Sequence, residues 1–163
     1  MGCFVFKQKN MKRRQFIYTA VTVIVIACIS LSALTRSGAT PPKTDEKGIS
    51  FIEQDWDKAL KQAKAEKKLV FLDVYTTWCG PCKLLKKNTF TDQKVGEFFN
   101  KNFVSVSVDA EKGVGLSLAQ KFSVSGYPSL IVTDAEGNPV LYTMGYIDPK
   151  TLMDFAQAAL NKK

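Results

Sequence analysis

The chain predicts an α/β fold, with a central mixed β-sheet flanked by helices and preceded by one N-terminal hydrophobic helix. Between residues 49 and 163, short apolar runs of strand length alternate with amphipathic stretches of helical length. Before them, residues 15–35 are 21 uncharged and mostly apolar residues. About 115 residues suffice for one domain with its own core. We therefore expect a signal or anchor segment at 1–35, a linker at 36–48 and a single domain at 49–163.

The leader, residues 1–35, predicts export. At about 1.5 Å per helical residue its apolar run can cross about 30 Å of hydrocarbon. Basic residues precede the run, so the positive-inside rule places the N-terminus in the cytoplasm and the domain outside. These basic residues are Lys7, Lys9, Lys12, Arg13 and Arg14.

Three fates of the leader stay open, and all of them place the domain outside the cytoplasm. Its length favours an uncleaved anchor, whereas cleavage after Ala39 would release a secreted protein. Residues 25–28 resemble a lipobox, which would make Cys28 a lipidated terminus. Arg13-Arg14 also resembles a twin-arginine export signal, and Met11 is an alternative start.

Charge is concentrated in the leader. The whole chain carries +8, but residues 40–163 contain 17 Lys, no Arg and 15 acidic residues, a net +2. Nucleic-acid binding needs clustered positive charge, so we expect no nucleic-acid partner. The linker, with Pro41-Pro42, would reach about 20 Å as a flexible coil.

The first elements of the domain follow from residues 55–87. Asp55 or a neighbouring residue is expected to cap a helix that reaches about Lys67. Residues 69–75 are a continuous apolar run, which is typical of a strand covered on both faces. Residues 83–87 favour a helix, in whose first turn Pro81 is tolerated because its missing N–H removes no helical hydrogen bond.

The later elements complete the α/β pattern. Residues 88–95 interrupt the preceding helix and start another turn. Residues 103–108 alternate as a strand, and residues 115–122 predict a short helix. Two further strands, 130–133 and 140–143, predict a hairpin around a turn-rich loop. Finally, Asp148-Pro149 predicts the start of a terminal helix that reaches about Leu160.

Two cysteines lie where the strand 69–75 gives way to a helix, in the sequence Trp78-Cys79-Gly80-Pro81-Cys82. Unpaired N–H groups and the positive end of the helix dipole favour the thiolate of Cys79, which we expect to be the nucleophile. Cys82 lies one turn further on the same side and can attack a mixed disulfide formed at Cys79. The pair predicts a redox-active disulfide.

Other uses of this pair fit less well. A structural zinc site needs about four Cys or His ligands, while the chain has no His and its other cysteines, Cys3 and Cys28, lie in the leader. Covalent haem attachment needs a His where Lys83 stands, and a Cys-His hydrolase needs a His as its base. We expect no metal and no cofactor. A disulfide that only staples the turn stays open, although so short a loop removes little unfolded-chain entropy.

With these residues in place, the chain resembles the thioredoxin family over about residues 49–163. Asp73 falls where thioredoxins carry a buried acid beneath the disulfide, Tyr127-Pro128 matches the family's cis-proline, and Gly145 matches a glycine near the active-site surface. The resemblance implies a thioredoxin-like fold and a surface that binds substrates. The residues implied for that surface are Trp78, Gly80, Pro81, Tyr127, Pro128 and Gly145.

Three of these positions keep a second interpretation. If Asp73 is buried, its pKa rises and it can relay a proton to or from Cys82, but it could also lie at a solvated strand end. Pro128 could be an ordinary trans turn proline. Trp78 could be a packing residue rather than a contact for partners.

The sequence also departs from ordinary thioredoxins. Where they commonly have a lysine near the buried acid, alignment through the strand 103–109 places Ser105, which leaves Asp73 without an obvious cationic partner. With the interrupted active-site helix, this is more similar to thioredoxin-like domains of bacterial envelope proteins. Among them is the C-terminal domain of the transmembrane thiol:disulfide interchange proteins. That kinship implies the periplasmic side of a bacterial cell envelope, with the chain secreted or anchored in the inner membrane.

The sequence therefore predicts an extracytoplasmic thiol:disulfide oxidoreductase that reduces protein disulfides, with Cys79, Cys82 and Asp73 as its catalytic residues. Its expected partners are protein thiols and disulfides, an upstream membrane thiol that donates electrons, and the membrane itself through the leader. The alternative is a non-catalytic, membrane-tethered module that senses redox state or binds a client.

Overall fold

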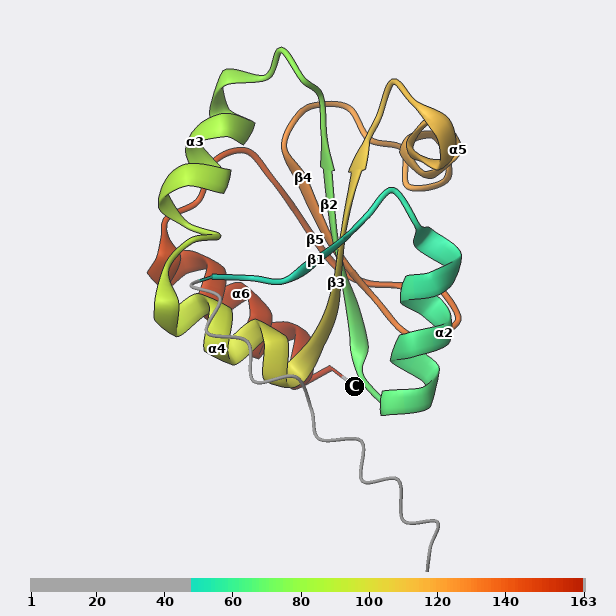
Figure 1. Ribbon diagram of the computed structural model, residues 1–163, viewed down its shortest axis with the longest axis vertical. Coiled ribbons are helices and arrows are strands. Elements are labelled where there is room, and N and C mark those ends of the chain that lie inside the picture. The colour runs from blue at the N-terminus through green and yellow to red at the C-terminus, as the bar shows by residue number, and fades with distance from the viewer. Residues whose placement is uncertain (1–47, 163) are drawn as a thin grey trace, which may run out of the picture. The chain divides into compact units, whose positions relative to one another are not determined.

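The computed structural model describes residues 48–162, which form a five-stranded mixed sheet with helices on both faces (Figure 1). The strands are β1 (Phe51–Glu53), β2 (Leu69–Tyr75), β3 (Phe103–Asp109), β4 (Ser129–Thr133) and β5 (Pro139–Met144), in the order β1-β3-β2-β4-β5. β3 pairs in parallel with β1 and β2, whereas β4 runs antiparallel to β2 and β5. The predicted α/β fold with a mixed sheet is confirmed for this part of the chain.

The helices form two layers. They are α2 (Trp56–Glu66), α3 (Gly80–Asn88), α4 (Gln93–Asn102), α5 (Gly113–Lys121) and α6 (Pro149–Leu160). Figure 1 shows α2 and α5 on one side of the sheet and α3, α4 and α6 on the other. Each layer closes its own hydrophobic cluster against the sheet.

Aspartates begin three of these helices by accepting hydrogen bonds from free backbone N–H groups of the first turn. Asp55 accepts from Lys58 N at 2.9 Å. Asp92 accepts from Val95 N at 3.0 Å, and Asp148 accepts from Thr151 N at 3.1 Å. Such caps satisfy donors that have no partner within the helix. The predicted starts of α2 and α6 are confirmed.

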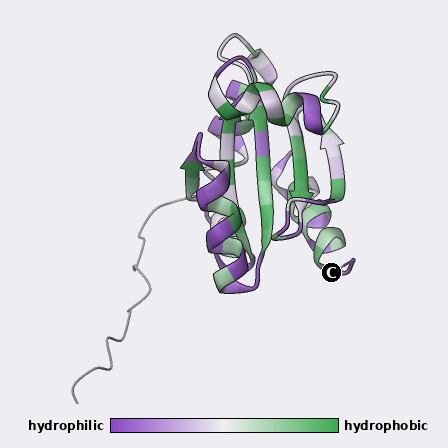
Figure 2. Ribbon diagram, turned by 90° about the vertical axis from the view of Figure 1, so that its right-hand side faces the viewer, coloured by the Kyte–Doolittle hydropathy of each residue, from purple (hydrophilic) through white to green (hydrophobic). Residues whose placement is uncertain are grey.

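Alternation along β2 decides which side chains face the candidate site. Val70, Leu72 and Val74 belong to the cluster under α2, and Leu69 and Phe71 belong to the cluster under α3, α4 and α6. Because successive strand residues point to opposite faces, the side chain of Asp73 lies on the α3 face. Figure 2 shows the hydrophobic strands at the centre and hydrophilic stretches on the helices.

Two elements were not predicted as such. β1 is only three residues long and pairs with β3 alone. α4 is a full helix of 10 residues where the sequence predicted another turn. It packs closely on the start of the domain, as the distance of 2.3 Å between a Cβ built on Gly96 and Gly48 O shows.

The helix α5 was predicted, but it begins at Gly113, two residues before its predicted start.

The predicted leader and nearly all of the predicted linker lie outside the described residues. Within residues 48–162, no helix has the length and apolar character that a membrane crossing needs.

Candidate active site

Cys79 and Cys82 form a disulfide with an S–S distance of 2.01 Å at the start of α3. Cys79 is the N-cap residue, and its Sγ accepts a hydrogen bond from Cys82 N at 3.0 Å. The predicted strand-to-helix turn is therefore present, with Pro81 in the first turn. Both cysteines are buried, with 3% of Cys79 and 7% of Cys82 exposed, so exposure does not tell the two sulfurs apart. Their positions do, because the first N–H groups and the helix dipole act on the Cys79 sulfur.

Asp73 is buried beneath α3, and the interpretation that it lies at a solvated strand end is wrong. Only 5% of it is exposed. Its Oδ2 accepts a hydrogen bond from Ser107 Oγ at 2.9 Å, while its Oδ1 has no hydrogen-bond partner. Burial raises the pKa of Asp73 from its ordinary 3.8 to about 7, although the Ser107 hydrogen bond and the charge of Lys86 act to lower it. The charge of Glu53 acts in the same direction as burial.

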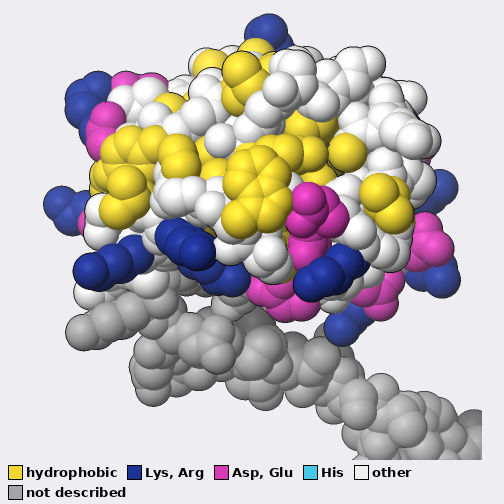
Figure 3. Space-filling model, turned by 90° about the horizontal axis from the view of Figure 1, so that it is seen from above, with side chains coloured by type: hydrophobic (Ala, Val, Ile, Leu, Met, Phe, Trp, Pro, Cys, Tyr) yellow, Lys and Arg dark blue, Asp and Glu magenta, His cyan; other side chains and the backbone are white. Residues whose placement is uncertain are grey.

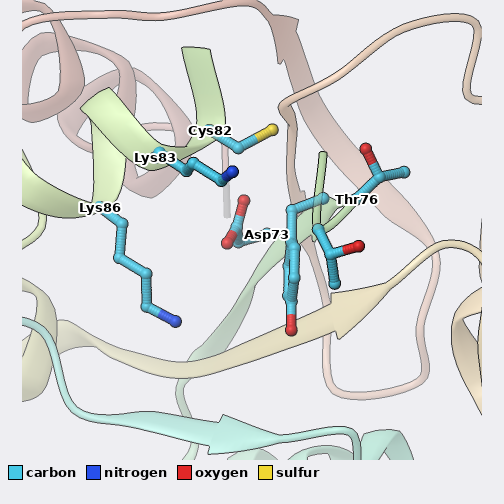
Figure 4. A pocket seen from close by; sticks show the side chains of 7 residues that line it. Asp73, Thr76, Cys82, Lys83 and Lys86 are labelled. Carbon is cyan, nitrogen blue, oxygen red and sulfur yellow. The ribbon is translucent and has the colours of Figure 1, made fainter. Parts of the chain in front are cut away.

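A pocket of about 200 Å³ joins this carboxyl group to the second cysteine. It is lined by Asp73, Tyr75, Thr76, Thr77, Cys82, Lys83 and Lys86. Figure 4 shows Cys82, Lys83 and Lys86 extending from α3 on one side of Asp73, with Thr76 on the other. Thr76 Oγ1, like Asp73 Oδ1, is buried without a hydrogen-bond partner. These two oxygens offer polar partners to water in a pocket of this size, and such water can connect the carboxyl group to Cys82.

The hydroxyl that contacts Asp73 belongs to Ser107, and not to Ser105, which the alignment places where thioredoxins commonly have a lysine. In the parallel pairing of β2 with β3, Ser105 lies opposite Phe71, and Ser107 lies opposite Asp73. Ser105 Oγ is buried without a hydrogen-bond partner. The sequence analysis missed Ser107, which the alternation of β3 places on the same face as Ser105. It also missed Lys86, the cation whose charge acts on Asp73, because this lysine comes from α3 and not from the strand on which the family's lysine lies.

Aromatic and backbone contacts link the remaining predicted residues to the disulfide. The Trp78 ring, directly before Cys79, packs edge-on against the Tyr127 ring with centroids 6.0 Å apart. The Tyr127-Pro128 peptide bond is cis, as the resemblance implied, so the trans alternative is wrong. Gly145 N donates a hydrogen bond to Pro128 O at 2.8 Å, with Gly145 at φ +93°.

Trp78 is a surface residue with a defined orientation. It is 65% exposed, which rules out the interpretation as a packing residue. Its Nε1 donates a hydrogen bond to Glu111 Oε1 at 3.0 Å. The backbone N of Glu111 in turn donates to Asp109 Oδ1 at 3.1 Å. Sequence analysis missed Glu111 because 33 residues separate it from Trp78.

Hydrophobic side chains gather on the face of the described domain that Figure 3 shows, which is the upper end in Figure 1, where α3 begins. Trp78, Met144 and Tyr146 are among the large hydrophobic residues that are exposed. Met144 Sδ lies against Gly126, because a Cβ built there would be 2.8 Å away. Gly80 and Pro81 are also exposed. Substrate binding by the predicted surface residues stays a prediction.

No cluster of three or more His, Cys, Asp or Glu side chains within residues 48–162 could hold a metal ion.

Comparison with known proteins gives relatives of the same kind. The chain matches the family described as "Thioredoxin-like domain" over residues 56–160. It is 33% identical over 98 residues to the thiol:disulfide interchange protein DsbD of Yersinia pestis (strain Pestoides F), covering 58% of this chain and 16% of that protein. It is 30% identical over 130 residues to DsbD of Ralstonia nicotianae, covering 76% of this chain and 21% of that protein. The chain thus spans about a fifth or less of the length of these curated relatives.

A solved structure extends the likeness to nearly a whole protein. The solution structure of a candidate disulphide-isomerase from Bacteroides thetaiotaomicron is 39% identical, with a TM-score of 0.64. The match covers 72% of this chain and 97% of that one. Together with the described fold and its Cys79–Cys82 disulfide, these matches show that the chain belongs to the thioredoxin-like family, with a domain of the thiol:disulfide oxidoreductase type.

Proposed function

We propose that this protein reduces protein disulfides on the extracytoplasmic side of a bacterial cell envelope, through the dithiol form of Cys79 and Cys82. The observation that carries the proposal is the pocket that Cys82 shares with Asp73, whose Oδ1 has no hydrogen-bond partner. A disulfide that only staples a turn does not need a buried acid beside one of its sulfurs.

The first step uses the position of Cys79 at the start of α3. In the reduced protein, the first N–H groups and the helix dipole favour the Cys79 thiolate. That thiolate attacks one sulfur of the substrate disulfide, forms a mixed disulfide and expels the other substrate sulfur as a thiolate. The exposed Trp78, beside Cys79, offers the substrate an apolar contact.

The second step uses Asp73. The Cys82 thiol gives its proton to the Asp73 carboxylate, directly or through water in the shared pocket. The resulting Cys82 thiolate attacks Cys79 Sγ, which forms the Cys79–Cys82 disulfide and expels the second substrate thiolate. Two electrons pass to the substrate, and Asp73 later returns its proton to Cys82 when a donor dithiol reduces the pair.

The leader and the relatives support the location and the source of electrons. The likeness to interchange proteins supports a membrane thiol as the upstream donor. The proposed organisation is a leader at 1–35, a linker at 36–48 and the redox domain at 49–163. The leader, anchored, cleaved or lipidated at Cys28, would export that domain to the periplasmic side.

Reduction of insulin by the purified protein with dithiothreitol tests the proposal. We expect turnover by the wild type and by Cys28→Ser, and none above background by Cys79→Ser. Asp73→Asn should lower the rate of insulin reduction by up to about 10²–10⁴-fold, which is the rate contribution that a positioned acid or base typically makes. Wild-type turnover no faster than that of Cys79→Ser would contradict the proposal, and rates of Asp73→Asn equal to wild type from pH 6 to 9 would exclude the proton relay.

A non-catalytic module that senses redox state or binds a client is the competing function, which the exposed Trp78 also favours. Cys82→Ser separates the two, because without Cys82 a mixed disulfide at Cys79 is not resolved. The oxidoreductase should trap several proteins together with its donor. A single trapped partner, with no insulin turnover by the wild type, would favour the binding module.

A further inference from the structure

The buried acid and a lysine of α3 face the same pocket. Cys82 and Lys86 are four residues apart on α3, a spacing that places both side chains on one face of the helix. Both line the pocket into which the carboxyl group of Asp73 opens. The resemblance implied a lysine on the strand 103–109, where this chain has serines. In this chain Lys86 brings a positive charge to the pocket of Asp73 from α3.

An aromatic ring of β2 keeps that charge near the pocket. Lys86 Nζ lies 5.7 Å from the centroid of the Tyr75 ring. Tyr75 follows Asp73 by two residues on β2, so both side chains lie on the same face of the strand, and Tyr75 lines the pocket as well. A cation above an aromatic face is attracted by the ring, which favours this position of the lysine.

Of the two lysines that line the pocket, Lys83 and Lys86, Lys86 is the one whose charge acts to lower the pKa of Asp73. From β3, Ser107 donates a neutral hydrogen bond, and from β4, Leu130 is apolar. From β1, the charge of Glu53 opposes ionisation of Asp73, whereas the charge of Lys86 favours it. Lys83 also lines the pocket from α3, beside Cys82. Thr76 adds a hydroxyl but no charge.

We propose that Lys86 is a positioning residue for disulfide exchange, which keeps Asp73 in the ionised form that accepts the proton of Cys82. This proposal rests on the proposed function. In the step concerned, the S–H bond of Cys82 breaks, the proton goes to Asp73 Oδ1, and the electron pair stays on sulfur to attack Cys79. An ammonium group beside the pocket stabilises the carboxylate that exists before this transfer. Without it, fewer molecules carry a base that is ready at neutral pH.

The test compares Lys86→Met with Lys87→Met in the full-length protein. Lys87 is the matched control, because it lies on the same helix and does not line the pocket, and its substitution by Met removes the same charge. The first readout is the ¹³C carboxyl resonance of Asp73 against pH in the oxidised protein, identified by its loss in Asp73→Asn. The second is the pH profile of insulin reduction.

We expect Lys86→Met to move the Asp73 midpoint up by about 0.5 pH unit, the order of magnitude that Coulomb's law gives for the loss of one neighbouring exposed charge in a water-like dielectric. The acidic limb of the rate profile should move equally, with about threefold slower turnover below the midpoint and wild-type rates at high pH. Lys87→Met should move neither, and Lys86→Arg should restore both. The displacement should shrink at 1 M salt, because Lys86 is exposed.

An unchanged Asp73 midpoint in folded Lys86→Met would overturn the proposal, and so would an equal displacement in Lys87→Met. The resonance needs no turnover, so it separates this proposal from the proposed function. If the wild type did not reduce insulin, the proposed function would fail, while the midpoint would still decide whether Lys86 acts on Asp73.

Discussion

At the residue scale, the carboxyl group of Asp73 makes the stability of the oxidised protein depend on pH. Its pKa is about 7 in the folded protein and has an ordinary value of 3.8. Between these values the folded protein binds a proton that the unfolded chain has lost. Stability contributed by the neutral acid is therefore present below pH 4 and is lost as the pH rises through 7.

Asp73→Asn should remove this dependence. We expect the oxidised variant to match the wild type at pH 4 and to exceed its free energy of unfolding at pH 8 by up to about 4 kcal/mol. Urea unfolding at both pH values measures the difference, with the exposed Asp57→Asn as the control. A stability difference of the same size at pH 4 and pH 8 would show that Asp73 does not bind a proton on folding in this range.

Glu111 is the second residue with a specific role to test. Its carboxylate accepts a hydrogen bond from the indole of Trp78, which is 65% exposed. Glu111→Ala should move the Nε1–H resonance of Trp78 and raise the KM for insulin by up to about fivefold, the equivalent of an exposed hydrogen bond of about 1 kcal/mol. Glu111→Gln keeps an acceptor and should change less, and Glu97→Ala is the charge-matched control. An identical resonance in Glu111→Ala would mean that the contact does not orient Trp78 in solution.

At the scale of the elements, two glycines give opposite expectations. A Cβ on Gly115 of α5 would lie 1.9 Å from Asp109 O on β3, whereas a Cβ on Gly80 of α3 would meet no atom within 4 Å. Gly115→Ala should lower the free energy of unfolding by about 1–3 kcal/mol or more, because the helix must move off the sheet. Gly80→Ala should stay within about 1 kcal/mol of the wild type. Equal stabilities in urea would contradict the close packing of α5.

The elements that the sequence predicts well are those whose signals are local. Asp55 and Asp148 mark helix starts by their own side chains, and the apolar run 69–75 needs no partner to be recognised as a strand. β1 could not be predicted, because three residues pair only with a strand about 50 residues further along the chain. The same reason explains why the sequence analysis missed Ser107, since the register between β2 and β3 depends on tertiary packing.

At the scale of the whole molecule, the described domain brings the site together from distant parts of the chain. The cysteines and Asp73 follow from one strand-turn-helix segment, which the sequence shows directly. Glu111, Tyr127 and Gly145 belong to three other segments, and only the topology of the sheet brings them toward Trp78 and Pro128. Motif spacing therefore predicted the disulfide, but not the contacts that orient the surface around it.

Three hydrogen bonds hold the first described residues of the domain in place. Ile49 N donates to Phe90 O at 2.8 Å, Asn100 Nδ2 donates to Gly48 O at 3.1 Å, and Ser50 N donates to Asn100 Oδ1 at 2.9 Å. These contacts fix residues 48–50 against the segment that ends α3 and against α4. A fragment of residues 45–163 keeps all of them, and a fragment of residues 52–163 loses all three.

We expect the 45–163 fragment to unfold cooperatively in urea and to reduce insulin as fast as the full-length protein. The 52–163 fragment should be less stable by at least about 3 kcal/mol, since a net hydrogen bond contributes about 1 kcal/mol and the fragment also loses the Phe51 ring, which packs against Phe71 and Phe90. Asn100→Ala in the longer fragment is the matched control, because it removes two of the three hydrogen bonds and should lose an intermediate amount. If the 45–163 fragment does not fold, the domain needs residues before 45, and the proposed division into leader, linker and redox domain is wrong.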